Sequence, residues 1–153
     1  MKMKWYTVAA AIGAVAILAS CNAAASIPTT LQVTVNNTVV YNNGSYAFPT
    51  MSKSGTLSAN FTIKNTSTTD TIHLTAGPTG NPVYFTDTTY FKVQTQPSTT
   101  IPPGQSVSFT IQNNPYTGSN YTAGSTYSST LRIYNDASDT TPFYQFALSI
   151  TLN

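Results

Sequence analysis

The chain has few of the residues on which most catalytic and metal sites depend. Among its 153 residues there is one cysteine, Cys21, and one histidine, His73, and glutamate is absent. A single cysteine excludes a disulfide within the chain, and a lone histidine without further thiols argues against a structural zinc site. His73 could join a serine and Asp70 or Asp87 by count, but no nucleophile-elbow motif accompanies them. We therefore predict no enzymatic activity, no metal and no cofactor.

Charge is equally scarce. Charged residues make up 7% of the chain, against about 25% in typical domains. The surface must therefore consist mainly of hydroxyl and amide groups. The cations Lys53, Lys64, Lys92 and Arg132 are dispersed along the sequence. Because phosphate binding requires a clustered basic face, we do not expect a nucleic-acid partner.

The N-terminal segment lacks the length of a membrane span. Its apolar run, residues 8–19, has 12 residues, whereas a spanning helix needs about 20. Lys2 and Lys4 precede this run and small residues follow it, which is the order found in a cleaved secretory signal over residues 1–20. Loss of the two lysines would leave four basic and four acidic residues, so the remaining chain is close to neutral.

The run ends in Leu18-Ala19-Ser20-Cys21. An ordinary signal-peptidase site has small residues at positions −3 and −1, but Leu18 occupies −3 here. The four residues instead resemble the bacterial lipobox. That resemblance implies signal-peptidase recognition of Leu18, Ala19 and Ser20, cleavage before Cys21 and lipidation of Cys21. Two or more acyl chains would anchor the protein firmly, because each buried methylene contributes about 0.8 kcal/mol. Asn22, in place of the aspartate that resembles an inner-membrane retention signal, favours an outer-membrane or cell-surface location. The alternative is a plain secreted protein with an incidental cysteine.

The rest of the chain alternates apolar and polar residues. Residues 21–30 are small and polar and predict a flexible tether. The period of two then indicates half-buried strands. We expect β-structure at residues 31–35, 39–41, 46–48, 57–64, 72–74, 83–85, 91–95, 107–111, 127–133 and 144–152. Asn42-Asn43-Gly44 and Pro103-Gly104 predict turns, the latter of type II. Together these patterns predict an antiparallel β-sandwich of seven to eight strands over residues 31–153.

Six segments in this order resemble the choice-of-anchor D domain, a relative of the ASPM/SPD-2/hydin immunoglobulin-like domains. They begin with Tyr41-Asn-Asn-Gly-Ser-Tyr-Ala-Phe48 and Phe61-Thr-Ile-Lys-Asn-Thr66, and they extend to residues 142–148. The resemblance implies an immunoglobulin-like sandwich on an extracytoplasmic bacterial protein, without catalytic residues. The chain departs from the family at Asn113, where an inward apolar residue is usual, in the longer loop 114–126, and in the absence of a terminal glycine.

Two groups of residues are candidate sites. Tyr116, Tyr121 and Tyr127 lie in or beside the long polar loop, a composition typical of binding loops; the alternative is that they cap the end of the sandwich. Asn135, Asp136 and Asp139 gather oxygen ligands of the kind that calcium prefers. The same residue types are also the usual ones in a hairpin turn, where they bond to the backbone.

We therefore predict a non-enzymatic lipoprotein of the bacterial envelope that presents an immunoglobulin-like domain for adhesion or protein–protein contact, with an unknown protein or glycan as partner. A structural spacer or assembly subunit without an external ligand is the alternative. A carbohydrate-binding module is a third possibility, but it needs an exposed aromatic platform, which the sequence alone does not locate.

Overall fold

The chain folds into two β-sheets. The computed structural model describes residues 30–115, 121–140 and 142–153, which contain eleven strands and no helix. Five strands form one sheet in the order β2-β1-β4-β9-β7, four form a second in the order β3-β11-β10-β6, and β5 pairs with β8. The strands are β1 (Leu31–Val35), β2 (Thr38–Val40), β3 (Gly44–Ala47), β4 (Ser58–Asn65), β5 (Ile72–His73), β6 (Val83–Phe85), β7 (Phe91–Thr95), β8 (Thr100–Ile101), β9 (Ser106–Asn113), β10 (Thr126–Tyr134) and β11 (Phe143–Thr151).

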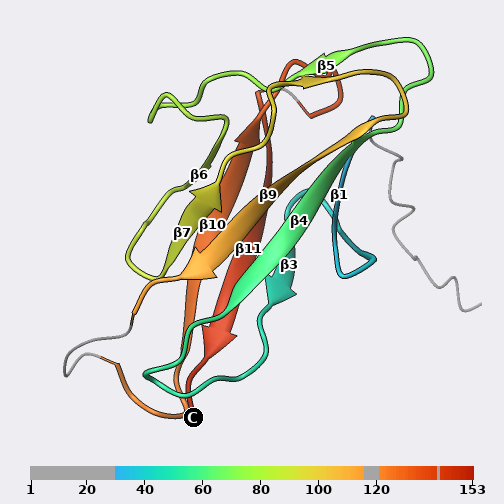
Figure 1. Ribbon diagram of the computed structural model, residues 1–153. Coiled ribbons are helices and arrows are strands. Elements are labelled where there is room, and N and C mark those ends of the chain that lie inside the picture. Colours follow the sequence, from blue (N-terminus) through green and yellow to red (C-terminus); the bar gives the residue numbers. More distant parts are fainter. Residues whose placement is uncertain (1–29, 116–120, 141) are drawn as a thin grey trace, which may run out of the picture.

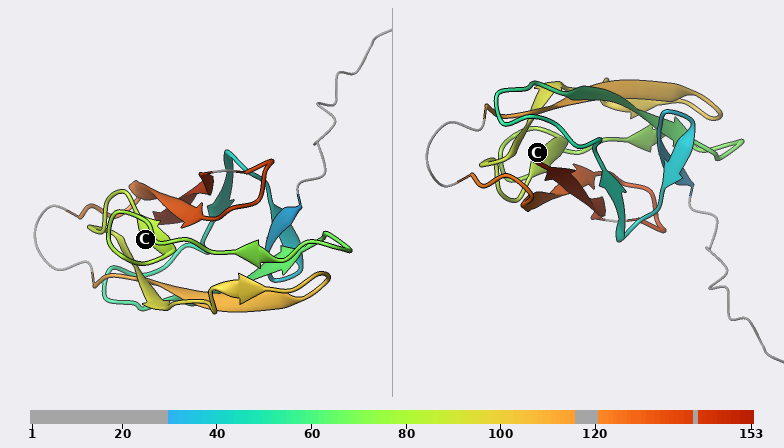
Figure 2. Two further views of the ribbon diagram at one scale, coloured as in Figure 1. Left: turned by 90° about the horizontal axis from the view of Figure 1, so that it is seen from above. Right: turned by 90° about the horizontal axis from the view of Figure 1, so that it is seen from below.

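The two larger sheets pack face to face as an immunoglobulin-like β-sandwich. Figure 1 shows β4 and β9 in front of β10 and β11. Figure 2 shows the two layers one above the other, seen from the two ends of the sandwich. The fold class predicted from the sequence is confirmed. Every predicted strand is present, and β8 is additional. The number exceeds seven or eight because several strands are separate segments of only two or three residues.

Alternating residues of both sheets form the core. Phe61 of β4 stacks on Phe109 of β9, with ring centroids 5.3 Å apart, and it also meets Phe146 of β11 at 5.8 Å. Along β11, every second residue from Tyr144 to Ile150 is buried, as the alternation predicted. Because a fully buried aromatic or aliphatic side chain stabilises the fold by roughly 1.5–3 kcal/mol, these inner faces are the main source of stability.

The turns follow the local sequence. Gln105 donates its backbone N–H to the carbonyl of Pro102 at 3.1 Å, and Gly104 has a φ of 72°, which confirms the type II turn. Asn36 and Asn37 join β1 to β2 with φ angles of 49° and 62°. Positive φ at both central residues identifies a type I′ hairpin turn, a geometry that asparagine tolerates.

One strand pairing differs from the predicted antiparallel pattern. Gly44 donates to the Tyr41 carbonyl at 2.9 Å, which confirms a turn at this point. However, the turn does not form a hairpin, because β2 belongs to the first sheet and β3 to the second. Having crossed between sheets, β3 runs parallel to β11, with Tyr46 opposite Leu148.

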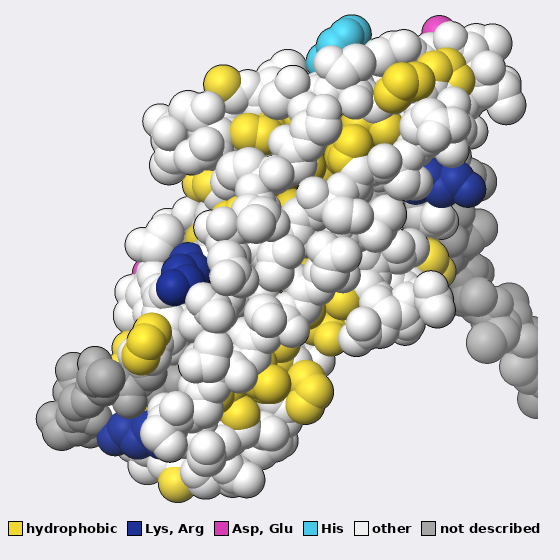
Figure 3. Space-filling model, viewed as in Figure 1, with side chains coloured by type: hydrophobic (Ala, Val, Ile, Leu, Met, Phe, Trp, Pro, Cys, Tyr) yellow, Lys and Arg dark blue, Asp and Glu magenta, His cyan; other side chains and the backbone are white. Residues whose placement is uncertain are grey.

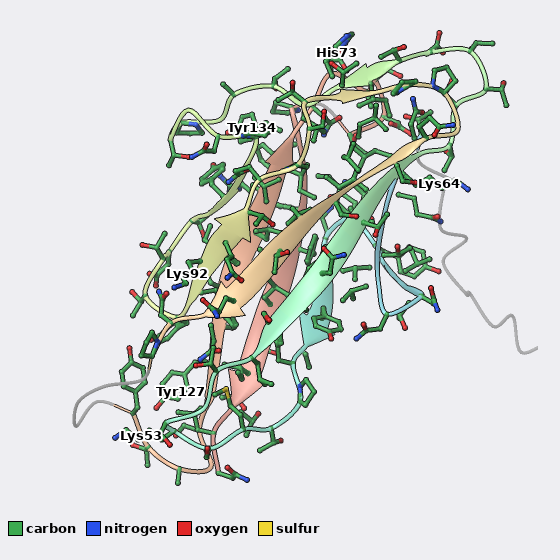
Figure 4. All side chains as sticks on the ribbon, viewed as in Figure 1. Lys53, Lys64, His73, Lys92, Tyr127 and Tyr134 are labelled. Carbon is green, nitrogen blue, oxygen red and sulfur yellow. The ribbon has the colours of Figure 1, made fainter. Side chains whose placement is uncertain are left out.

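The described chain begins at one end of the sandwich. The backbone N–H and hydroxyl of Thr30 donate to the Asp139 carboxylate at 2.6 and 2.8 Å. The Thr30 carbonyl accepts the Thr66 N–H at 2.8 Å. His73 and Lys64 are at this same end, whereas Tyr127 and the C-terminus are at the other (Figures 1 and 4).

Candidate interaction surfaces

Tyrosines gather at the end of the sandwich that is remote from Thr30. The rings of Tyr121 and Tyr127 meet at 5.3 Å, and Tyr90 contacts both, at 6.2 and 5.2 Å. The Tyr127 hydroxyl accepts the backbone N–H of Thr122 at 2.8 Å. All three tyrosines are half-buried and pack against the core. The structure therefore brings two predicted site residues together and gives them the capping position of the alternative interpretation, with part of each ring still exposed.

Tyr116 lies outside the described residues. Tyr90 was not found from the sequence. It directly precedes β7, and no local pattern indicates that this segment meets the loop before β10. Only the tertiary fold places the three described rings in one cluster.

Two asparagines hold this end in place. Asn113, which is 1% exposed, accepts the Leu57 N–H at 2.6 Å through its amide oxygen, and its amide nitrogen donates to the Asn114 carbonyl at 3.0 Å. Asn114 in turn donates to the Thr88 carbonyl at 2.6 Å. Asn113 does point inward, at the position where the choice-of-anchor D pattern has an apolar residue. Its amide bonds to Gly55 and Leu57 in the segment before β4 and to the adjacent Asn114.

The three calcium candidates do not converge on one point. Asn135 is 2% exposed, and its amide oxygen accepts from the Ala137 N–H at 3.0 Å and from the Thr140 hydroxyl at 2.8 Å. Asp139 binds Thr30, and Asp136 binds His73. The bond from Ala137 back to Asn135 is that of an Asx turn, which is the hairpin-turn interpretation of this segment. Among the described residues, no group of three histidine, cysteine or acidic side chains could hold a metal ion.

His73 has an acidic partner, but at the surface. Its Nδ1 lies 2.9 Å from an Asp136 carboxylate oxygen, and its backbone N–H donates to the other oxygen at 2.7 Å. Partial burial acts to raise the pKa of Asp136, but the hydrogen bonds and charge of His73 outweigh it and hold that pKa below its usual value. The two side chains are 57% and 45% exposed. Thus His73 pairs with neither Asp70 nor Asp87, and its acid is not the buried one that a catalytic triad uses.

The outer face of the second sheet carries a cluster that sequence reasoning missed. The rings of Tyr84 and Tyr134 are 5.7 Å apart, and that of Phe143 lies 5.4 Å from Tyr134. The guanidinium of Arg132, the chain's only arginine, stacks over Phe143 at 4.4 Å. We call these four residues the aromatic–arginine face. Figure 4 shows Tyr134 in the upper half of the molecule, closer to His73 than to Tyr127.

The pKa values of Tyr84 and Tyr134 shift in opposite directions. Burial acts to raise the pKa of Tyr84, but hydrogen bonds from Tyr134 and Arg132 and the arginine charge bring it below its usual value. The hydrogen bond to Tyr84 raises the pKa of Tyr134 instead. The guanidinium itself is positioned by its stacking on Phe143 and by the hydrogen bond from its Nε to the Gln145 amide oxygen.

Comparison with known proteins identifies the fold but no family. No family model and no curated protein matches the chain. A solved protein of unknown function from Porphyromonas gingivalis W83 is similar with a TM-score of 0.55 and 13% identity, over 81% of this chain and 47% of that one. The VesB protease of Vibrio cholerae has a TM-score of 0.52 and 12% identity, over 80% and 32%. The PapD-like domain 7 of human CEP192 has a TM-score of 0.49 and 16% identity, over 98% of both chains.

The first two likenesses show a shared β-sandwich fold and nothing finer, because their identities are low. The chain spans less than half of either protein, so their activities do not carry over, and no comparison supports an enzyme. The class of protein that emerges is an immunoglobulin-like domain. Within the described residues there is also no helix long and apolar enough to cross a membrane.

Proposed function

We propose that the protein is a lipid-anchored component of the bacterial envelope whose immunoglobulin-like domain makes contacts with another molecule at its membrane-distal end. Anchoring rests on the lipobox residues Leu18 to Cys21, which lie outside the described residues. The six segments that resemble the choice-of-anchor D domain support an extracytoplasmic location. The location proposed is the outer membrane or the cell surface.

One structural observation supports this proposal above the others. Thr30, the first described residue, is bound to Asp139 and Thr66 at one end of the sandwich, and Tyr121 and Tyr127 lie at the opposite end (Figures 1 and 4). An anchor that joins the domain at Thr30 therefore leaves the tyrosine end facing away from the membrane. Rigid, partly exposed tyrosines are effective contact residues because they lose little conformational entropy on binding.

Lipidation has a direct test. Cells that produce the protein are fed a labelled fatty acid, and the chain is then isolated. We expect label on the wild-type chain and none on Cys21→Ala, with Ser20→Ala, which keeps a small residue in the lipobox, labelled like wild type. Label that persists on Cys21→Ala would contradict the anchoring proposal.

Binding through the tyrosine end is tested by retention of envelope and host extracellular material on the immobilised, detergent-solubilised protein. Material retained by wild type should be lost with Tyr121→Ala plus Tyr127→Ala and kept with Lys64→Ala, a change at the opposite end. Because the tyrosines also pack on the core, the thermal midpoint of each variant is measured alongside. A double variant that stays folded and still binds would exclude this site.

The half-buried state of Tyr121 and Tyr127 favours one alternative function. If capping is their whole role, the domain is a spacer or assembly subunit without an external ligand. Protease treatment of intact cells separates the two. A domain displayed outward is cleaved, whereas a periplasmic spacer is spared until the outer membrane is opened.

A further inference from the structure

The two outer faces of the sandwich differ in chemistry. The outward side chains of β4 and β9 are serine, asparagine, threonine, glutamine and lysine. Figure 3 shows that this face is mainly polar, with cations far apart. The outer face of the second sheet instead carries the aromatic–arginine face, which is where rings and a cation occur together. A cluster of this kind on a domain with so few charges is a candidate ligand site.

Strand register assembles the cluster. Arg132 of β10 stands opposite Tyr84 of β6 on one side and opposite Gln145 of β11 on the other. Tyr134, the next outward residue of β10, stands opposite Phe143. The row of Tyr84, Arg132 and Gln145 thus crosses three strands, and the adjacent row of Tyr134 and Phe143 crosses two. The row of Tyr134 and Phe143 supplies apolar ring area. The row of Tyr84, Arg132 and Gln145 supplies hydrogen-bonding groups.

The side chains of the cluster contact one another and the neighbouring backbone. The Nε of Arg132 donates to the Gln145 amide oxygen at 3.2 Å, and the Gln145 amide nitrogen donates to the Asn43 amide oxygen at 2.9 Å. A Cβ placed on Gly77 would lie 3.1 Å from both the Tyr84 and Tyr134 rings, so the loop backbone packs closely against them. Side chains fixed in this way lose little entropy when a ligand binds.

A polar hollow adjoins these rows. It has a volume of about 180 Å³ and is lined by Asn43, Gly44, Thr130, Gln145, Phe146 and Ala147. Its rim offers the Thr130 hydroxyl and the amides of Asn43 and Gln145. Hydroxyl-rich ligands match such a rim, because hydroxyls both donate and accept hydrogen bonds.

The charge of Arg132 is not neutralised within the described part of the chain. Asp136 pairs with His73, and Asp70 and Asp139 are near that same end of the sandwich. The remaining acid, Asp87, accepts hydrogen bonds from Thr89. The guanidinium has five N–H donors, and the contacts with Gln145 and Tyr84 leave some available. A carboxylate is the complement that binds a guanidinium most specifically, through paired hydrogen bonds.

We propose that the aromatic–arginine face, with the adjoining hollow, binds an acidic oligosaccharide. The carboxylate of a uronic-acid unit pairs with Arg132, the apolar face of a sugar ring packs on Tyr134 and Phe143, and hydroxyls bond to the rim of the hollow. The combination of rings, amides and a single cation favours an acidic sugar over an acidic peptide, which would use the cation but not the hydroxyl-matched rim. This site is separate from the tyrosine end and independent of lipidation.

The test uses the full chain in detergent, titrated calorimetrically with three probes. These are an oligogalacturonate, the same oligomer with its carboxylates methyl-esterified, and an oligoglutamate of equal charge. We expect binding of the oligogalacturonate alone. Arg132→Gln should weaken it at least tenfold, and Tyr134→Ala should weaken it too. The matched control Lys64→Gln removes a cation from the opposite outer face and should leave affinity unchanged.

Each other outcome would overturn the proposal. Equal binding of oligoglutamate would indicate an acidic protein partner, and equal loss in Arg132→Gln and Lys64→Gln would indicate nonspecific attraction. No binding of the oligogalacturonate by a folded wild-type chain would exclude an acidic sugar of this type. Circular dichroism of each variant establishes that it is folded, so that lost affinity is not mistaken for unfolding. None of these results depends on whether Cys21 is lipidated.

Discussion

Replacing Asn135 by aspartate separates the two interpretations of the 135–139 turn. Asparagine and aspartate have the same shape, but aspartate lacks the amide donors. In the structure these donors bond to the carbonyls of Ile133 at 3.0 Å and Thr140 at 3.4 Å. The variant would point a carboxylate oxygen at both carbonyls in a site that is 2% exposed in the wild type. The Asx-turn interpretation therefore predicts a large loss of stability.

The magnitude follows from the groups involved. Losing two hydrogen bonds costs about 1 kcal/mol each, and leaving buried carbonyls and a buried charge unpaired adds to this. We expect a loss of about 3–5 kcal/mol in the free energy of unfolding at pH 7. Burial raises the pKa of the new carboxyl above its unfolded value, so the charge destabilises the fold above that unfolded pKa. The loss should therefore shrink as the pH falls and the carboxyl takes up a proton.

The assay is urea denaturation at pH 7 with and without calcium. Asn60→Asp is the matched control, because Asn60 is exposed on β4, and it should change stability by less than about 0.5 kcal/mol. If the segment were a calcium site, Asn135→Asp would add a ligand beside Asp136 and Asp139, and calcium would restore or raise stability. A calcium-dependent gain of that kind, or an unchanged stability, would refute the Asx-turn reasoning.

Two further predictions concern a buried tyrosine and a turn. Burial raises the pKa of Tyr144 to about 12 from an ordinary value of 10.0. As the pH rises, the unfolded chain therefore loses this proton before the folded chain does. Between pH 10 and 12, wild type should lose about 2–3 kcal/mol more stability than Tyr144→Phe. Parallel alkaline denaturation curves for the two proteins would contradict this. Gly104→Ala should lower the free energy of unfolding by about 1–2 kcal/mol, because the φ of 72° at this position is unfavourable for an L-residue. No atom would clash with the added Cβ. An unchanged midpoint in thermal or urea unfolding would show that the turn relaxes.

Local patterns were sufficient where the chemistry is local. The alternation in residues 57–64 and 144–152 identified β4 and β11, two of the four long core strands, because only one face of each strand is buried in the core. Pro103 and Gly104 identified a type II turn, since proline presets one central φ and glycine permits the other. The inward position of Asn113 continues the alternation of Phe109 and Ile111, and the sequence analysis noted this position only through the family resemblance.

The parallel pairing of β3 was not predictable in the same way. Asn43 and Gly44 indicate a turn, but the same residues suit a hairpin and a crossing to the opposite sheet. The choice depends on which edge is free, and β11, about 100 residues further on, supplies that edge. Tyr90 likewise joins Tyr121 and Tyr127 only through contacts between distant loops.

By itself the sequence determined the lipobox prediction, the fold class and the scarcity of charge, because each depends on residue types and their spacing along the chain. Only the tertiary structure decided that Thr30 and the tyrosine cluster lie at opposite ends, and that Tyr84, Arg132 and Phe143 form one surface. Those three residues lie on three strands, and in β6 the run Val83-Tyr84-Phe85 shows no alternation that would identify Tyr84 as outward-facing. The physical reason is that a surface across a sheet is made by strand register, which is settled when the two sheets bury their inner faces against each other.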